Sequence, residues 1–368
     1  MRQRLLALCL ALALLAALPG CGSLNRARAP APAIVGGSGA QLPDAAPNCT
    51  ANPDVAGVLR SAIEQQRDAV TVRGCPLDTV EACLSELMAD PALFWCVGYS
   101  LTASTLLTTT TEITFRWLYD DGPARYAALC AAADEVLAAA PEGDYATALY
   151  LYDWLQTHVT YAEQEGFDQT AYAAICEGSA VCGGIADAYT FLLTRAGLAA
   201  RTVIGTALDG GQASGHAWNL AVLDGAAYCF DLTWDNSDRY DAGGAAYLMH
   251  DWFAVTSAAF DPTHTPANAA DAVQTDANAA NYYIHEGYVL TEDSDAALLA
   301  ILRPQVAQGS NVLTFRCADD TVYDAVTFRL FDLKEAAGVL RALGLAGYGS
   351  VAWTYSLQDA LYIVTIYR

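Results

Sequence analysis

The sequence predicts an α+β fold in which a helix carries a cysteine and two neighbouring antiparallel strands carry a histidine and an aspartate. Three observations predict it. A glycine-flanked helix start surrounds Cys182, a β-hairpin pattern runs from His216 to Asp231, and a β-α-β-β pattern lies near each end of the folded part. Each pattern follows from the spacing of apolar residues, which differs between helices and strands.

The chain begins with the features of an export signal. Two arginines precede an apolar run from Leu5 to Leu18, which is too short to span a membrane. The four residues that end at Cys21 resemble the cleavage site of a bacterial lipoprotein signal, which implies a lipid anchor on Cys21 and an extracytoplasmic location. Free secretion is the alternative. We expect residues 1–20 to be the signal peptide and residues 21–50 to be a flexible linker.

Both ends of the folded part predict small α/β modules with the order strand, helix, strand, strand. In the first module, residues 51–122, we expect these elements at residues 69–75, 77–90, 94–102 and 112–119. In the second module, residues 306–368, we expect them at residues 312–317, 332–343, 351–356 and 361–367. Both first strands contain Thr-x-Arg and then a cysteine, which indicates a pseudo-repeat. Such modules would present substrate, dock a partner, or only pack.

Between the modules, the sequence predicts a catalytic domain at residues 123–262 and a connecting region at residues 263–305. The domain is expected to begin with two helices, at residues 126–140 and 145–159. The connecting region is rich in Ala, Asn, Asp and Thr, and we expect a loop beside the cleft there. A surface or packing role is expected for three histidines that belong to no motif, His250, His264 and His285.

The helix that carries the cysteine is predicted to begin at Cys182 and to end before Gly197. Gly178 and Ser179 are turn and cap residues, and apolar residues then recur at helical spacing up to Arg195. A cysteine at a helix N-terminus lies near backbone N–H groups and the positive end of the helix dipole, which favour the thiolate. The same N–H groups are suited to stabilising an oxyanion.

His216 and Asp231 fall on one face of the predicted hairpin. Alternating apolar residues flank Asp224-Gly225, which is a two-residue turn signal. If the residues that flank this turn pair with each other, Asp231 lies opposite Trp218. Thr233 then lies opposite His216, and Asp231 becomes the diagonal neighbour of His216 at ~7–8 Å between backbones. A carboxylate there would fix the tautomer of the imidazole and stabilise its protonated form.

Three motifs between about Tyr161 and Asp235 resemble those of bacterial transglutaminase-like domains. They are Val181-Cys182-Gly183-Gly184, His216-Ala217-Trp218-Asn219 and Asp231-Leu232-Thr233-Trp234-Asp235. Ile185 and Ala186 follow where the family often has an aromatic residue and then alanine, which is a minor departure. The resemblance implies a papain-like core, in which the cysteine helix packs on the antiparallel sheet. It also implies Cys182 as the nucleophile, His216 as the general base and acid, and Asp231 as the residue that orients the histidine.

By this resemblance, the chain is expected to be an enzyme that attacks protein or peptide amides at the cell envelope through a thioester on Cys182. An amine acceptor would give cross-linking, and water would give deamidation or proteolysis. Two other functions stay open: a non-catalytic envelope lipoprotein and a cell-wall endopeptidase. Tyr161 or Trp154 is expected to supply a second oxyanion donor, unless both only pack, and Trp218 to form a wall of the cleft.

The amino-acid composition limits the classes of molecule that the protein is expected to bind. A net charge of −23 argues against nucleic acid, whose phosphates such a chain would repel. No metal or cofactor is expected. Four residues are conceivable metal ligands: Cys176, Cys182, His216 and Cys229. Their spacing lacks the close Cys-x-x-Cys pairs of structural zinc sites. Cys176 is expected to be structural and Cys229 to lie near the site. Of the 11 cysteines, those other than Cys9, Cys21 and Cys182 either form disulfides or remain buried thiols.

Overall fold

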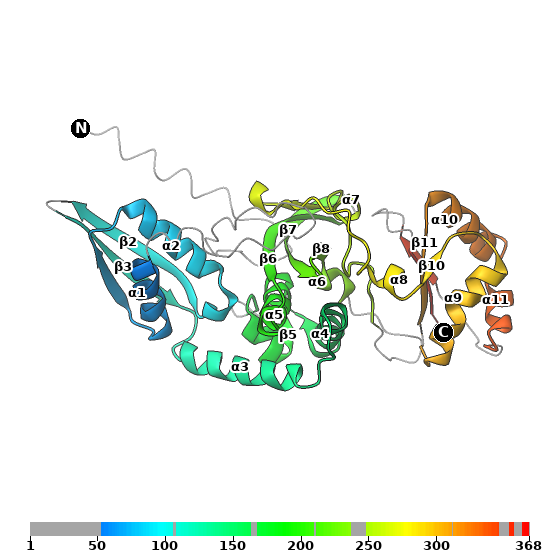
Figure 1. Cartoon of the computed structure of the whole chain (residues 1–368), viewed down its shortest axis with the longest axis horizontal. Helices are drawn as coiled ribbons and strands as arrows, with labels where there is room; N and C mark the ends of the chain where they lie inside the picture. The colour runs from blue at the N-terminus through cyan, green and yellow to red at the C-terminus, as the bar shows by residue number, and fades with distance from the viewer. Residues whose placement is uncertain are drawn as a thin grey trace.

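The computed structural model describes residues 53–105, 108–162, 168–209, 211–236, 248–310, 312–345, 353–356 and 363–367. The predicted signal peptide, the predicted linker and Cys21 lie outside these residues. Three units follow one another along the long axis of the molecule: an N-terminal α/β unit, a central unit and a C-terminal α/β unit (Figure 1). Within the described part of the chain, no helix has both the length and the apolar character that a membrane span requires.

The N-terminal unit is a three-stranded antiparallel sheet, in the order β1-β3-β2, with two helices. Its elements are α1 (Pro53–Glu64), β1 (Ala69–Arg73), α2 (Leu77–Ala89), a 3-10 turn (Pro91–Leu93), β2 (Cys96–Thr105) and β3 (Thr109–Trp117). Apolar residues of α2 recur at helical spacing, and Val80, Leu84 and Leu87 among them are buried. The strand, helix, strand, strand order predicted here is observed, with the ends of the elements shifted by a few residues.

The C-terminal unit has a four-stranded sheet in the order β10-β11-β13-β12. Its elements are β10 (Val289–Leu290), α9 (Asp295–Ala307), β11 (Val312–Cys317), α10 (Asp320–Thr327), a π-helical turn (Phe328–Asp332), α11 (Ala336–Ala342), β12 (Trp353–Ser356) and β13 (Ile363–Tyr367). In both flanking units a helix precedes the first long strand, and the last strand lies between the two longer strands before it, β3 between β1 and β2 and β13 between β11 and β12, while β10 adds a fourth strand beside β11. The two units therefore share a topology, while the boundaries of the domains stay predictions.

The helices of the C-terminal unit differ from the prediction. The sequence pattern predicts one helix at residues 332–343, whereas α10 and a π-helical turn precede the shorter α11. The helix α10 begins after Asp319, whose side chain accepts a hydrogen bond from the backbone N–H of Val322 at 2.9 Å. Aspartate is a strong N-cap residue, so the sequence does contain the signal for this helix start.

The central unit packs α5 against an antiparallel sheet in the order β8-β7-β6-β9. Its elements up to the site are α3 (Gly122–Leu137), α4 (Asp144–His158), β4 (Thr160–Tyr161), a π-helical turn (Ala173–Glu177), β5 (Ser179–Ala180), α5 (Cys182–Arg195), β6 (Ala200–Asp209), β7 (Gln212–Leu223), β8 (Ala226–Phe230) and α6 (Leu232–Asp235). Every residue of α5 from Cys182 to Leu193 is buried, so this helix forms part of the core. An α+β fold with antiparallel sheets is confirmed.

The hairpin of β7 and β8 has the predicted register. Leu223 pairs with Ala226. The two turn residues between them have φ angles of 50° and 80°, as a two-residue hairpin turn requires. The strand β8 ends at Phe230 because Asp231 caps the short helix α6. Thr233 therefore lies in that helix, and its predicted position opposite a residue of β7 is wrong.

The fourth strand of the central sheet comes from the predicted connecting region. The strand β9 (His264–Pro266) pairs antiparallel with β6 and follows the short helix α7 (Ser257–Phe260). A 3-10 turn (Ala269–Asp271) and α8 (Tyr282–His285) come after it. The expectation of a loop at this point is therefore wrong for β9. The strand is only three residues long and shows no apolar alternation, so the pattern on which strand prediction depends is absent.

Candidate active site

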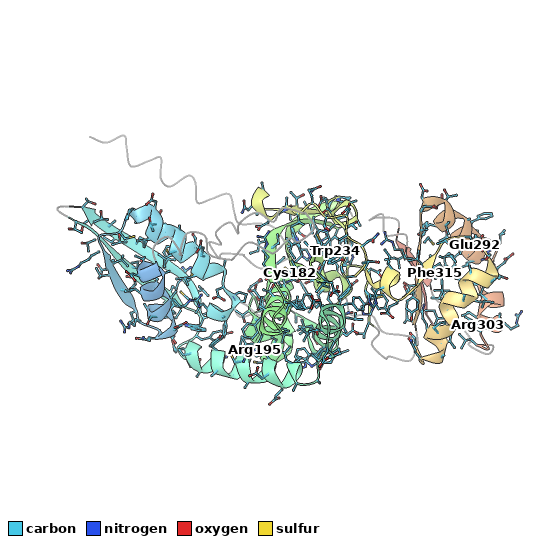
Figure 2. The ribbon with its side chains drawn as sticks, in the orientation of Figure 1. Cys182, Arg195, Trp234, Glu292, Arg303 and Phe315 are labelled. Carbon is cyan, nitrogen blue, oxygen red and sulfur yellow. The ribbon has the colours of Figure 1, made fainter. Side chains whose placement is uncertain are left out.

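Cys182 is the first residue of α5, as the sequence predicts. Val181 before it is extended, with φ −103° and ψ −177°. The helix then begins with a hydrogen bond of 3.0 Å from the backbone N–H of Ile185 to the carbonyl of Val181. Backbone N–H groups of a first helical turn point toward the N-terminal end, where Cys182 lies. Figure 2 labels this residue in the central unit, and its side chain is buried.

The two glycines after Cys182 permit a close approach of another chain segment. A Cβ atom added at Gly184 would lie 2.5 Å from the carbonyl oxygen of Asp168, and one added at Gly183 would collide with the side chain of Gln169. The carbonyl of Asp168 also accepts a hydrogen bond of 3.1 Å from the backbone N–H of the residue before Cys182. The glycines of the first motif therefore allow Asp168 and Gln169 to reach the start of α5.

A buried contact fixes α5 against the strand that carries His216. Asn219 on β7 donates a hydrogen bond of 2.7 Å to the carbonyl of Ala186 on α5. Cys182 packs in a buried cluster with Ala186 and Ala217. Because Ala217 directly follows His216, the start of α5 contacts β7 within one residue of the histidine.

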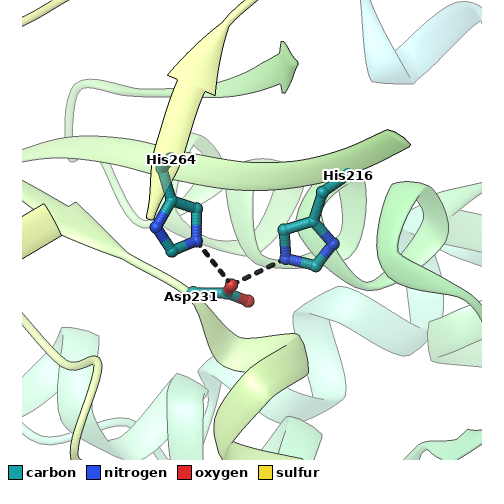
Figure 3. A group of neighbouring side chains, drawn as sticks. All are labelled: His216, Asp231 and His264. Carbon is teal, nitrogen blue, oxygen red and sulfur yellow. Dashed lines mark hydrogen bonds and ion pairs between the residues drawn. The ribbon is translucent and has the colours of Figure 1, made fainter. Parts of the chain in front are cut away.

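His216 and Asp231 form a buried hydrogen-bonded pair. The distance between His216 Nε2 and Asp231 Oδ2 is 2.7 Å, and the two residues are 5% and 0% exposed. Figure 3 shows the two side chains facing each other. An ionised carboxylate only accepts hydrogen bonds, so Nε2 of His216 carries a proton in this pair. The contact that the hairpin pattern predicts is therefore present.

Asp231 accepts hydrogen bonds on both carboxylate oxygens. Oδ1 accepts from the backbone N–H of Trp234 at 3.1 Å, and Oδ2 accepts from Nε2 of His216 and, at 3.0 Å, from Nε2 of His264. Burial alone would raise the pKa of Asp231. The charges and hydrogen bonds of the two histidines outweigh burial and hold the pKa of this carboxyl below its usual range. Asp231 is therefore an anion in the folded protein at neutral pH.

His264 is a site residue that the sequence analysis missed. It is 2% exposed, so the expected surface role is wrong, whereas the expected packing role is present together with a contact between its imidazole and Asp231 (Figure 3). The other two histidines do pack or lie at the surface: His250 is buried beside Asp153, and His285 is exposed and stacks on Tyr145. No motif surrounds His264. The sequence offers one weak signal for His264: the chain has only 5 histidines, so each of them is a candidate site residue.

Aromatic rings enclose the imidazole of His264. The centroid of the His264 ring lies 3.7 Å from that of Phe260 and 4.6 Å from that of Trp234. The ring centroids of Trp218 and Trp252 lie 5.1 Å and 5.3 Å away. Trp234 also stacks on His216, with centroids 5.6 Å apart. Trp218, which the sequence predicts as a wall of the cleft, is 3% exposed and packs in this cluster. The cluster fixes the plane and position of both imidazoles.

The two residues expected to supply an oxyanion donor lie in different places. Tyr161 on β4 pairs with Ala180, which lies two residues before Cys182 in the chain. Trp154 on α4 stacks on His158, with ring centroids 4.2 Å apart. Tyr161 is therefore on the strand beside the approach to α5, whereas the indole of Trp154 contacts its own helix.

Gln169 is a further candidate for an oxyanion donor. The nitrogen and the oxygen of its carboxamide are both buried and have no hydrogen-bond partner among the residues that the structure describes. Its carboxamide oxygen is the side-chain atom nearest to Gly183, the residue after Cys182. A buried polar group without a partner is costly, and functional sites are where such groups are retained. No sequence pattern marks this residue.

Two other cysteines of the central unit, Cys176 and Cys229, are poor nucleophiles. Cys176 lies in the π-helical turn, where burial and then the charge of Glu177 raise its pKa to about 11. Cys229 lies on β8, where burial and then the charge of Asp261 raise its pKa far above the usual range of a thiol. Four of the cysteines expected either to pair or to stay as thiols are free: Cys130, Cys176, Cys229 and Cys317.

The same side chains have the chemistry of metal ligands. Among the described residues, His216, Asp231 and His264 form the one group whose ligand atoms, all within 4.8 Å of one another, could hold an ion. Two imidazole nitrogens and a carboxylate oxygen suit zinc. Each nitrogen lies 2.7 or 3.0 Å from the carboxylate oxygen, which is hydrogen-bond distance, so a proton on each nitrogen accounts for the arrangement.

Comparison with known proteins indicates a class for the central unit. Residues 131–231 match the family model of the transglutaminase-like superfamily. The matched segment holds Cys182, His216 and Asp231 and makes up well under half of the chain. The chain therefore contains a transglutaminase-like domain, as the motifs predict. No curated protein matches the chain.

Three solved structures are similar to part of the chain. A TGase has 14% identity and a TM-score of 0.26, over 41% of this chain and 48% of that one. A candidate cysteine protease from Cytophaga hutchinsonii has 16% identity and a TM-score of 0.27, over 45% and 65%. A candidate protease from Parabacteroides distasonis has 8% identity and a TM-score of 0.19, over 44% and 37%. The chain thus spans less than two thirds of each of them.

Proposed function

We propose that this protein is a thiol-dependent acyl-transfer enzyme that acts on protein or peptide amides. The observation that carries the proposal is the buried hydrogen bond of 2.7 Å between His216 and Asp231, on the strand against which the Cys182 helix packs. The match of residues 131–231 to the transglutaminase-like superfamily supports thiol chemistry. In this proposal Cys182 is the nucleophile, His216 is the general base and acid, and Asp231 orients the imidazole.

The first half-reaction forms a thioester. His216 Nδ1 takes the proton of the Cys182 thiol, and the sulfur attacks the carbonyl carbon of the amide, whose C=O π electrons move to the oxygen. When that oxyanion collapses, the C–N bond breaks and the leaving nitrogen takes the proton from the imidazolium. Asp231 lowers the barrier because it stabilises the imidazolium through Nε2–H.

The oxyanion needs donors at the start of α5. The backbone N–H groups of the first turn point toward this end of the helix, and the Gln169 carboxamide lies against Gly183 in the same turn. We add the Gln169 carboxamide to Tyr161 and Trp154 as a candidate for the second donor. Its Nε2 would be the donor atom and would reach the start of α5 when the amide is turned, because Oε1 is the atom that faces Gly183. Its lack of a partner within the described chain supports this role, because a donor kept ready for the transition state has none in the resting enzyme.

The second half-reaction transfers the acyl group. His216 Nδ1 takes a proton from an amine or from water, the acceptor attacks the thioester carbonyl, and the C–S bond breaks. The Cys182 sulfur then recovers the proton from His216. An amine acceptor gives an amide cross-link, and water gives deamidation or peptide cleavage.

The proposed place of action is the cell envelope. It rests on the signal-like start of the chain and on Cys21, whose lipidation would hold the enzyme at the membrane. Stable anchoring needs at least two lipid groups, because one acyl chain binds only marginally. Intact-mass analysis of the mature N-terminus should show acyl chains on Cys21. An unmodified terminus would indicate secretion instead.

The proposed activity is tested by incubating the purified protein with envelope proteins and a labelled primary amine. Mass spectrometry then detects amine incorporation, deamidation or cleavage. We expect one of these changes with the wild type and none with Cys182→Ala. Cys176→Ala is the matched control, because this thiol has a raised pKa and lies outside the proposed site, so it should keep the activity.

The outcomes separate the alternative functions. Cleavage of wall peptides alone would identify an endopeptidase. No difference between the wild type and Cys182→Ala on any of these substrates would overturn the proposal and favour a non-catalytic envelope protein.

A further inference from the structure

We propose that His264 is a positioning residue of this site, whose Nε2–H holds the Asp231 carboxylate in the orientation in which it binds His216. The inference deepens the proposed function and rests on it. Three separate segments meet at this carboxylate, because His216 lies on β7, Asp231 follows β8 and His264 begins β9. Figure 3 shows the carboxylate between the two imidazoles.

The first step of the argument is the cost of burying Asp231. Its side chain is 0% exposed, so its charge must be compensated by protein groups. Oδ1 accepts a hydrogen bond from the backbone N–H of Trp234 at 3.1 Å. Oδ2 accepts one from His216 at 2.7 Å and one from His264 at 3.0 Å. Without His264, His216 would be the one side chain that binds Oδ2, and its ring also exchanges a proton at Nδ1 in the proposed reaction. His264 therefore supplies a second donor to Oδ2 from a ring that takes no part in proton transfer.

The second step is the rigidity of His264 itself. Its Nδ1 lies 2.9 Å from Thr263 Oγ1 and 3.3 Å from the backbone carbonyl oxygen of Phe260, and its Nε2 donates to Asp231, so polar partners hold both ring nitrogens. The ring of Phe260 stacks on the imidazole at 3.7 Å, and three tryptophans surround it. The donor of His264 therefore points at one place, which is what a positioning residue requires.

The consequence concerns the thiolate of Cys182. If the His264 donor is lost, Asp231 either takes up a proton or turns away from His216. Both changes weaken the stabilisation of the His216 imidazolium, and the thiolate that depends on it becomes less stable. The loss should therefore be visible at the sulfur, which is not a neighbour of His264 in the chain.

Three variants separate hydrogen bonding from packing. His264→Phe keeps a ring for the stack on Phe260 but removes the donor. His264→Gln places an amide N–H near the position of Nε2. His250→Phe is the matched control, because His250 is also buried, also binds a carboxylate, at 2.7 Å, and also stacks on an aromatic ring. If His264→Phe does not fold, His264→Asn replaces it, since its shorter amide does not reach Oδ2.

The readout is the rate at which iodoacetamide alkylates Cys182, measured against pH in the presence of EDTA. EDTA removes any metal held by the same side chains. In His264→Phe we expect a rate about ten-fold lower at pH 7, the effect of losing one hydrogen bond to a charged group. The acid limb of its profile should move toward the ordinary thiol pKa of about 8.5. His264→Gln should recover most of the rate, and His250→Phe should keep it.

A double-mutant cycle shows whether His264 acts through Asp231. In an Asp231→Asn background, His264→Phe should change the alkylation rate by less than about two-fold. The inference is overturned if folded His264→Phe has the wild-type profile, if His264→Gln gives no recovery, or if His264→Phe has its full effect without Asp231. A wild-type profile that is ordinary and insensitive to His216→Ala would instead overturn the proposed function.

Discussion

At the residue scale, the carboxylate of Asp231 joins three parts of the central unit. It caps α6, binds His216 on β7 and binds His264 on β9. The aspartate of the third motif therefore has a structural role in ending β8 as well as the proposed role in orienting a base. An asparagine keeps the shape and the cap but loses the charge, so it separates the two roles.

Asp231→Asn should fold and lose most of its activity. An amide can donate to His216 Nε2, which would stabilise the tautomer that carries its proton on Nδ1 and cannot act as the base. We expect kcat to fall by about 10⁴-fold, as when a triad aspartate is replaced by asparagine. Amine incorporation measures kcat, and circular dichroism checks the fold. A loss below about ten-fold in a folded variant would contradict the assigned role.

Gln169→Ala should lower kcat without changing the reactivity of the thiol. Loss of one oxyanion donor costs about 10²–10³-fold in kcat. Alkylation of Cys182 by iodoacetamide forms no oxyanion, so its rate should stay at the wild-type value. Gln65→Ala, at an exposed glutamine after α1, is the control. Equal losses of turnover and of alkylation in Gln169→Ala would show that the residue only supports the fold.

Asp235 should make the stability of the protein depend on pH. Burial and then the charge of Asp251 raise the pKa of Asp235 well above its usual range, while Tyr152 donates to its carboxyl group at 2.7 Å. The folded state therefore binds the proton more tightly than the unfolded state. The resulting stability is fully present below the unfolded pKa of about 3.9 and is lost as the pH rises toward the folded pKa.

Asp235→Asn is neutral at every pH and should not show this loss. We expect the melting temperature of the wild type to fall relative to that of Asp235→Asn between pH 4 and pH 8. The expected difference is ~2–4 °C for each kcal/mol of linkage. Differential scanning calorimetry at both pH values measures it. Parallel melting curves across this range would contradict a raised pKa.

At the scale of elements, the position of α5 depends on small residues at its start and on a side-chain clamp near its middle. The glycines after Cys182 admit residues 168–170, and Asn219 binds the carbonyl of Ala186. The first motif therefore encodes a packing contact. Gly184, the second glycine of this motif, faces backbone atoms, which cannot move away by a change of rotamer as a side chain can.

Gly184→Ala should destabilise the protein more than Gly183→Ala. The new Cβ at residue 184 would meet the Asp168 carbonyl oxygen at 2.5 Å, whereas at residue 183 it would meet the end of the Gln169 side chain. Overpacking of this kind costs about 1–3 kcal/mol. Urea unfolding of the two variants gives the comparison. Equal stability of both variants would show that the segment at Asp168 shifts without cost.

Elements with local signals were predictable and elements that depend on distant partners were not. The start of α5 at Cys182 and the register of the hairpin follow from glycine, turn and apolar patterns within a few residues. The strand β9 has only three residues and forms because β6 offers it an edge, which no local pattern reveals. The contact between His264 and Asp231 depends on that pairing, so the sequence could not show it.

At the scale of the whole molecule, the central unit lies between two units of the same topology (Figure 1). Both place the last strand of a strand, helix, strand, strand sequence between the two strands before it. The repeated Thr-x-Arg pattern marks the first strand of each, so this part of the organisation was accessible from sequence. The start of α10 also has a local signal, the Asp319 cap, although the pattern of apolar spacing predicts only one helix in this unit.

The central claim is that the Cys182 thiol is ionised by His216. The pH dependence of Cys182 alkylation in the wild type and in His216→Ala tests it most directly. We predict that wild-type alkylation continues well below the ordinary thiol pKa of about 8.5 and that His216→Ala returns it to the profile of a simple thiol. A wild-type profile with an ordinary midpoint that His216→Ala leaves unchanged would contradict the account.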